Sequence, residues 1–204
     1  DDMVAEGHYF LFDEEGRSSG MIRFIDYVRL PDKARFESGN REKDRNIVVV
    51  DLDNNHGWIR DGRKETREAT SEEMREYRNS ADRSLYNIFQ FRREDPQNRF
   101  FYLGAGAGHE ASREMVKIIS PENVEVTVHF DRVSRLPVKI ESLETNHKGI
   151  RQRLVDEYSQ WRSMQGAHVP MRIDQYINGR RASQQFIMKI EYNRGLQDQL
   201  FGRP

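Results

Sequence analysis

The chain of 204 residues carries 33 lysines and arginines, 34 aspartates and glutamates, and no cysteine. Its formal net charge of −1 lacks the basic excess that phosphate neutralisation requires, so the composition argues against a nucleic-acid partner. The absence of thiols excludes disulfides and thiolate-bound zinc. The longest aliphatic run, residues 47–50, is far shorter than the ~20 apolar residues that a membrane helix needs.

Apolar and polar residues alternate with a period of two along most of the chain. This pattern is typical of strands with one buried and one hydrated face. It is clearest over residues 124–130, where valines and a phenylalanine alternate with polar side chains. The pattern predicts strands near residues 7–12, 20–30, 33–38, 46–52, 56–60, 99–104, 112–119, 124–130, 136–144, 150–162, 168–177 and 182–192, arranged as a long antiparallel meander.

Turn residues separate these strands at short intervals. Asn178-Gly179 is the strongest hairpin signal, because both central residues of a type I′ turn need a positive φ. Asp61-Gly62 is interpreted in the same way, and residues 13–16 and 131–134 are typical of longer hairpin loops.

One segment, residues 70–91, departs from the period of two. Thr70 and Glu73 have the spacing of a capping box, and Pro96 limits any continuation of a helix. A helix of about 20 residues is about 30 Å long, enough to cross a wide sheet. Its predicted apolar stripe consists of Met74, Tyr77, Ala81, Leu85 and Ile88. No repeat or linker interrupts the chain, so we expect one domain over residues 1–204.

No motif in the sequence indicates catalysis. The glycine-rich residues 103–108 lack the final Gly or Ala of a dinucleotide fingerprint, because His109 stands there, and they are interpreted as a hairpin connection or a bulge. Asp51, Asp53 and Asn55 match only the start of a calcium loop and favour a hairpin turn.

The six histidines are scattered singly, without the spacing of a metal site. The default interpretation is that they are exposed, and His129 falls on the polar side of its strand. We therefore expect no enzymatic activity, no catalytic residue, no cofactor and no bound metal.

A dozen strands offer one large apolar face, and one helix is available to cover it. Antiparallel sheets solve this problem by closing, by stacking on a second sheet, or by curling around helices and leaving a cavity. Aromatic side chains that are candidates to line such a cavity, or else to fill an ordinary core, are Phe24, Phe36, Trp58, Phe89 and Phe91.

Four stretches, in this order, resemble the LolA-like family of periplasmic lipoprotein-localisation and lipid-binding proteins. They are the strand-turn-strand of residues 27–37 (YVRLPDKARFE), the Gly-Trp step at residues 57–58, the hairpin of residues 129–139 (HFDRVSRLPVK) and the ending of residues 192–204 (YNRGLQDQLFGRP). Arg194 stands where the family usually has proline, and the N-terminal helix of the family is absent or reduced to residues 1–6.

The resemblance implies a mainly β (α+β) fold: a strongly curved antiparallel sheet, an unclosed half-barrel, with one or more helices over its concave face. It implies a non-enzymatic periplasmic protein that holds acyl chains of lipids or lipoproteins between the sheet and a helical lid, about residues 70–91, with a role in outer-membrane lipoprotein sorting. We expect a monomer and leave peripheral membrane contact open. The alternative is an envelope protein-interaction or stress-sensing module on the same fold. The candidate lipid-binding residues are Phe24, Phe36, Trp58, Met74, Tyr77, Leu85, Ile88 and Met188.

Overall fold

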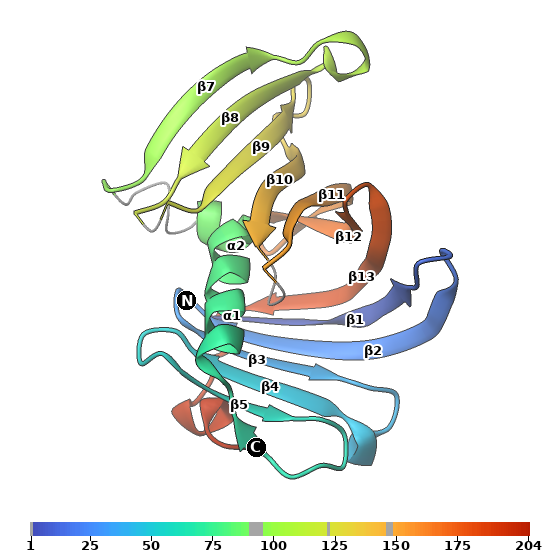
Figure 1. The fold of residues 1–204 in the computed structure, drawn as a ribbon, viewed down its shortest axis with the longest axis vertical. Helices are drawn as coiled ribbons and strands as arrows, with labels where there is room; N and C mark the ends of the chain where they lie inside the picture. Colours follow the sequence, from blue (N-terminus) through green and yellow to red (C-terminus); the bar gives the residue numbers. More distant parts are fainter. Residues whose placement is uncertain (1, 90–95, 122, 146–148) are drawn as a thin grey trace.

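The computed structural model describes residues 2–89, 96–121, 123–145 and 149–204. One antiparallel sheet of thirteen strands dominates it, in the order β6-β5-β4-β3-β2-β1-β13-β12-β11-β10-β9-β8-β7. The sheet is strongly curved, and within the described ranges its edge strands β6 and β7 do not pair, so no barrel closes (Figure 1). The strands are β1 (Asp2–Phe12), β2 (Ser18–Arg29), β3 (Lys33–Ser38), β4 (Asn46–Asp51), β5 (His56–Arg60), β6 (Arg67–Glu68), β7 (Arg99–Ala105), β8 (Arg113–Ile119), β9 (Glu125–Asp131), β10 (Pro137–Thr145), β11 (Arg151–Met164), β12 (Ala167–Ile177) and β13 (Arg180–Tyr192).

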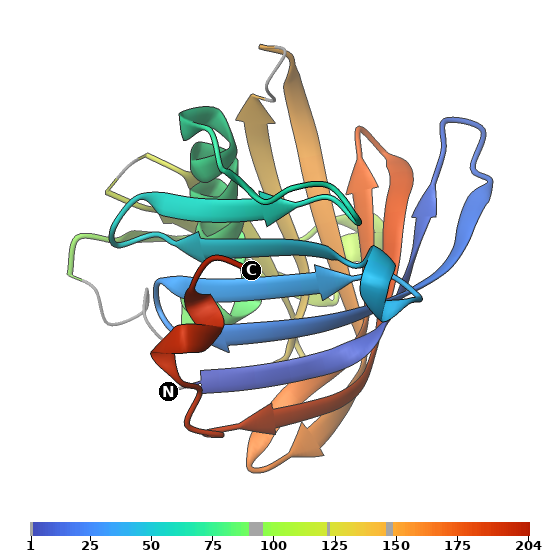
Figure 2. The same cartoon turned by 90° about the horizontal axis from the view of Figure 1, so that it is seen from below.

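The chain enters this sheet at its middle. β1 pairs with β2 on one side and with the last strand, β13, on the other, where Met3 lies opposite Tyr192 (Figure 2). From β1 the chain runs outward by hairpins to the edge strand β6, and from the opposite edge strand β7 it returns by hairpins to β13. This arrangement confirms the predicted fold class and most of the predicted meander; the β1–β13 pairing is what the meander alone did not predict.

The first strand begins earlier than the sequence pattern predicts. It starts at Asp2 rather than at residue 7, so residues 2–6 extend the sheet and form no helix. Gly7 is the reason that the pattern breaks there: a Cβ at this position would lie 2.0 Å from the backbone oxygen of Phe186. The strand continues through a register shift between Glu6 and Gly7.

The chain crosses the concave face as a helix that begins at the predicted capping box. Thr70 Oγ1 accepts a hydrogen bond from Glu73 N at 3.2 Å, and Glu73 Oε2 accepts one from Thr70 N at 2.8 Å. Helix α1 (Ser71–Arg83) then lies across the concave side of the sheet (Figure 1). No helix in the described part of the chain combines the length and the apolar character needed to cross a membrane.

The prediction of one continuous helix over residues 70–91 is wrong. Ser84 is extended, with φ −65° and ψ 139°, and its hydroxyl accepts a hydrogen bond from Asn87 N at 3.2 Å. Because the serine side chain offers the backbone this alternative bond, it ends α1 and caps the short helix α2 (Leu85–Asn87). Residues 90 and 91 of the predicted helix, Phe91 included, lie outside the described residues.

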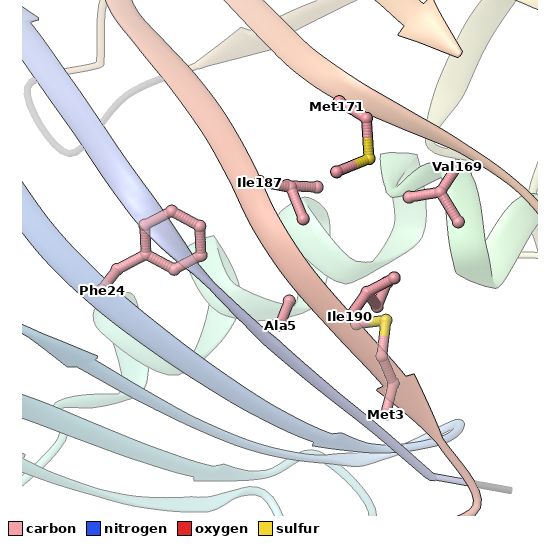
Figure 3. Close-up of a cluster of buried hydrophobic side chains, with 7 residues drawn as sticks. All are labelled: Met3, Ala5, Phe24, Val169, Met171, Ile187 and Ile190. Carbon is pink, nitrogen blue, oxygen red and sulfur yellow. The ribbon is translucent and has the colours of Figure 1, made fainter. Parts of the chain in front are cut away.

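Three apolar clusters hold these elements together. One joins β1, β2, β12 and β13 (Figure 3), and Tyr86 of α2 packs against it. A second joins Ile88 to β8–β11. The third lies on the convex face, where Figure 2 shows the C-terminal 3-10 helix (Asp198–Phe201) against the sheet. Phe201 of this helix packs with Ile47 and Val49. Apolar side chains on the convex side of β4 are therefore buried as well.

A polar cluster occupies the convex side of β9 and β10. His129 is only 5% exposed, so the expectation that it is exposed is wrong. Its Nε2 lies 3.3 Å from Glu141 Oε1, and Lys139 Nζ lies 2.6 Å from the same oxygen. Glu110, from the 3-10 turn that follows β7, lies 3.1 Å from Lys139 and covers this face. His129 does lie on the polar side of β9, as the alternation predicts. The 3-10 turn that carries Glu110 covers this side, and the histidine is therefore buried.

Candidate functional site

A cavity of about 310 Å³ lies between the concave face of the sheet and the two helices. Strands β1–β4 form one wall and β11–β13 the other, while residues 77–87 of α1 and α2 form the roof. Apolar side chains such as Val28, Val50 and Ile187 make up much of its lining. This size is at the lower end of the range of small-molecule sites, about 300–1,000 Å³.

Three of the predicted site residues line this cavity: Phe36 from β3, Tyr77 from α1 and Leu85 from α2. Phe36 is 36% exposed, more than its half-buried neighbours on the same face of β3, Ala34 and Ser38. Tyr77 and Leu85 lie on either side of the break at Ser84, so both helical pieces contribute to the roof.

Three other predicted residues are buried beside the cavity and do not line it. Phe24 belongs to the cluster of β1, β2, β12 and β13, and Ile88 to the cluster of β8–β11. Met74 is 2% exposed and packs against β5, where its Sδ lies over Gly57.

Trp58 and Met188 lie away from the cavity. Trp58 pairs with Val49 on the convex face, under the C-terminal segment. Met188 is 67% exposed on β13, close to the register shift between β1 and β13. Period-two alternation indicates which residues share a face, but it does not indicate which face is concave.

Asp26 is a cavity residue that the sequence analysis missed. It lies on the concave face of β2, opposite Ala5 on one neighbouring strand and Phe36 on the other. Burial raises the pKa of its carboxyl to about 7, so a substantial fraction is protonated at neutral pH. A sequence signal for it exists, since an acid interrupts the apolar side of a strand between Phe24 and Val28.

A second acid, Asp156 of β11, lines the opposite wall. Burial raises its pKa, while nearby Arg83 and a hydrogen bond from Gln175 Nε2 at 3.1 Å act in the other direction. Arg83 itself forms an ion pair with Glu144. The ionised form of Asp156 is therefore only partly compensated by its surroundings.

Three tyrosine side chains, Tyr77, Tyr86 and Tyr158, also line the cavity. Burial raises the pKa of Tyr77 to about 12, and it raises the pKa values of Tyr86 and Tyr158 further. Tyr86 is close enough to Asp26, and Tyr158 to Asp156, for each carboxylate to disfavour the neighbouring phenolate. All of these tyrosines remain protonated at any physiological pH.

A second hollow, of about 760 Å³, lies between α1 and β8–β11. Charged and polar side chains dominate its lining, among them Lys117, Glu125 and Arg153. It has no continuous apolar wall, so it is a poorer match for an acyl chain than the cavity beneath α2.

Structural comparison relates this architecture to three solved proteins. A domain assigned to outer membrane lipoprotein sorting, from Vibrio parahaemolyticus, matches with a TM-score of 0.60 at 12% identity, over 98% of this chain and 88% of that one. A LolA superfamily protein from Nitrosomonas europaea matches with a TM-score of 0.65 at 10% identity, over 100% of this chain and 90% of that one.

The chain has a LolA-like fold. A DUF1329 family protein from Desulfovibrio piger matches as well, with a TM-score of 0.61 at 10% identity, over 98% of this chain and 89% of that one. No family model matches the sequence, and no curated protein matches it. The LolA-like relationship is therefore one of fold, and the chemistry of the cavity has to be argued from this chain's own residues.

Proposed function

We propose that this LolA-like protein is a non-enzymatic periplasmic carrier of acyl chains, taken from lipids or lipoproteins in the manner of outer-membrane lipoprotein sorting. The observation that carries the proposal is the cavity of about 310 Å³ between the curved sheet and its helical roof. A curved sheet with a separate helical cover leaves such room between its two layers.

The energetics of an apolar guest favour this use. Each CH₂ group transferred from water stabilises a complex by about 0.8 kcal/mol. A chain of several carbons therefore supplies several kcal/mol before the costs of ordering the guest and the roof are subtracted. In this proposal the candidate lipid contacts are Phe36, Tyr77 and Leu85 in the lining, with Phe24, Met74 and Ile88 supporting the walls.

The roof is the element that opens in this mechanism. α1 and α2 are joined at the extended residue Ser84, so the two pieces can change their relative orientation by rotation of a few backbone angles. Met74 anchors the first piece on β5 and Ile88 anchors the second on β8–β11. We expect guest entry to require movement near Ser84 rather than rearrangement of the sheet.

A cavity-filling variant tests the proposal. Ala81 lines the cavity from α1, and Ala81→Trp places an indole in the space that the guest would occupy. Arg75→Trp adds the same group on the exposed side of the same helix and is the matched control. Native mass spectrometry and displacement of a fluorescent fatty acid measure binding.

We expect the wild type and Arg75→Trp to bind the probe and Ala81→Trp to bind at least 10-fold more weakly. Thermal unfolding of both variants checks that they remain folded. Equal binding by the folded Ala81→Trp variant, or a wild type that is empty and ignores every added lipid, would overturn the carrier proposal.

A second function is favoured by the edge strand β7. Phe100, Phe101, Tyr102 and Leu103 are 46%, 44%, 69% and 47% exposed, an unusual run for the edge of a sheet. Such an edge is able to recruit an extended peptide by strand addition, as an envelope interaction or stress-sensing module would. Leu103 has no partner in β8, because the register shifts between Tyr102 and Gly104.

This alternative has its own test. Leu103→Pro removes the N–H of the one β7 residue that lacks a register partner in β8, and leaves the paired residues of β7 unchanged. Affinity purification from an envelope extract, compared between wild type and Leu103→Pro, should show loss of a specific partner if strand addition is the function. Unchanged recovery of every partner would count against it.

A further inference from the structure

Asp26 is a carboxyl group in an apolar cavity without a compensating partner. It lines the space beneath α2, and it forms no hydrogen bond or ion pair with any residue in the described ranges. Burying an unpaired carboxylate is costly, and proteins retain such groups chiefly where they have a task.

The charged groups around the cavity leave a surplus of acid. Lys33 Nζ lies 3.2 Å from Asp51 Oδ2, and Arg83 pairs with Glu144, so both cations of the lining are already matched by carboxylates. Among the described residues, no ion pair matches the carboxyl groups of the lining, Asp26, Asp32 and Asp156, although Asp156 has Arg83 nearby and a hydrogen bond from Gln175. The titratable and charged groups that face this space are Asp26 and Asp32 from β2 and the turn after it, Lys33 from β3, Tyr77 and Arg83 from α1, Tyr86 from α2, and Asp156 and Tyr158 from β11, with Tyr192 of β13 next to Tyr86.

Aromatic rings accompany the unpaired acid. The side chain of Tyr86 is near Asp26, and Phe36 lies opposite Asp26 in the neighbouring strand. A cation is attracted both by a carboxylate and by the face of an aromatic ring, and more strongly where water is excluded. An anionic head group at this place would instead be repelled by the unpaired carboxylates of the lining.

We propose that the cavity selects amphiphiles with a cationic amine head group, whose ammonium lies against the Asp26 carboxylate beside Tyr86 while the alkyl chain fills the apolar part. This inference rests on the proposed function, because it names the head-group chemistry of the carried ligand. The contact with Asp26 is the same for a free alkylamine and for an amine-bearing lipid; the rest of the ligand distinguishes these two sources.

The pH dependence follows from the charge state of the acid. A permanent cation binds the ionised carboxyl, so its apparent affinity is reduced by the fraction of Asp26 that is protonated. With a pKa of about 7, raising the pH from 5.5 to 8.5 should strengthen binding roughly 30-fold. The affinity for a neutral amphiphile with the same chain should not follow this titration.

Three probes with ten carbons separate the contributions of head and chain: decyltrimethylammonium, decanol and decanoate. We expect calorimetric titration at pH 8 to give at least 10-fold tighter binding of the cation than of the alcohol, with decanoate weakest. Asp26→Asn keeps the shape of the side chain and should abolish the preference for the cation, so that the affinity for the cation falls at least 10-fold relative to the affinity for decanol. Glu14→Gln removes a carboxylate whose side chain is 86% exposed, at the tip of the β1–β2 hairpin, and is the matched control.

The outcomes are distinguishable. If decanol binds but the cation has no advantage, or if the cation's affinity is flat from pH 5.5 to 8.5 in the wild type, the head-group inference is overturned and the carrier proposal stands. If none of the three probes binds, the carrier proposal fails and this inference fails with it. The wild-type pH series needs no variant, so the test does not depend on the folding of Asp26→Asn.

Discussion

Gly57 of β5 lies directly beneath Met74 of α1, so close that a Cβ at Gly57 would be 2.8 Å from the methionine Sδ. The same Cβ would be 2.8 Å from the backbone oxygen of Val49 in the neighbouring strand. Glycine therefore sets the distance between the helix and the sheet at the point where α1 begins its path over the cavity.

Gly57→Ala is expected to destabilise the protein by about 1–3 kcal/mol, because the added methyl group overpacks this contact. Urea unfolding followed by circular dichroism measures the change. Gly57→Ala combined with Met74→Ala should be less destabilised than the sum of the two single variants, since the shorter side chain relieves part of the clash. Strict additivity would show that the backbone of β4, and not the helix, sets the constraint.

Asp2 ties the C-terminal segment to the start of the chain. Its Oδ1 accepts a hydrogen bond from Arg194 N at 2.6 Å, and its Oδ2 accepts one from Leu196 N at 2.8 Å. Burial raises the pKa of Asp2, but the backbone hydrogen bonds outweigh it, and the net shift is downward. A carboxyl whose pKa is lowered by folding stabilises the protein above its unfolded pKa of about 3.9, and this stability is lost as the pH falls.

Asp2→Asn is accordingly expected to cost about 1–2 kcal/mol at pH 7 and less at pH 3. Hydrogen exchange of the amides at residues 196–201 should become faster, because the segment loses its anchor. Asp53→Asn, in the exposed β4–β5 turn, is the control and should change neither quantity. Unchanged exchange at the C-terminus in Asp2→Asn would contradict the anchoring role.

Glu141 is the centre of the buried polar cluster on the convex side. Hydrogen bonding by His129 lowers the pKa of Glu141; burial acts in the opposite direction, and Lys139 and Arg153 lower it further. Stability from this lowered pKa is present above the unfolded pKa of about 4.3 and disappears as the pH falls.

Glu141→Gln should therefore destabilise the protein at pH 7 by about 1–3 kcal/mol, since Lys139 keeps only one of its carboxylate partners. The variant should also show a shallower loss of unfolding free energy between pH 7 and pH 3 than the wild type. Chemical denaturation at a series of pH values measures both. Identical slopes in the two proteins would mean that other carboxylates carry the acid sensitivity.

Phe201 covers the convex face beside Trp58, and the Arg29 guanidinium lies 5.0 Å from the centre of its ring. Phe201→Ala should cost about 3–5 kcal/mol, the usual range for a buried aromatic residue. It should leave binding of the fluorescent fatty acid unchanged in the folded protein, because the cavity is on the other face of the sheet. The fluorescence emission of Trp58 should shift to longer wavelength, because water reaches its indole ring. A loss of probe binding in the folded variant would contradict this expectation and place the binding site on the convex face.

Much of the local structure could be read from the residues. Alternation located eleven strands closely and the first one in part, and Asn178-Gly179 is indeed a turn in which both residues have positive φ, 52° and 80°. Thr70 and Glu73 form the capping box that their spacing predicts. These features depend on interactions within a few residues, which is why a single sequence contains the information.

Only part of the candidate site could be predicted from the sequence in this way. Phe36, Tyr77 and Leu85 line the cavity as predicted. They could be predicted because large apolar side chains on the sheet and on the covering helix are the usual lining of such a space. Trp58 and Met188 do not line the cavity, since both faces of the curved sheet carry apolar side chains and period-two alternation treats the faces alike. Asp26 was passed over because a single acid in a strand has no meaning until its neighbours are known.

The amino-acid sequence by itself determined that this chain forms hairpin-connected strands with one helical crossing and a LolA-like order of motifs. Only the tertiary structure decided that β1 pairs with β13, that the C-terminal segment covers the convex side, and that the Asp26 carboxyl faces an apolar space. These outcomes depend on contacts between residues far apart in the chain, such as Met3 and Tyr192, and the free energy of such contacts comes from how the whole sheet curves and packs.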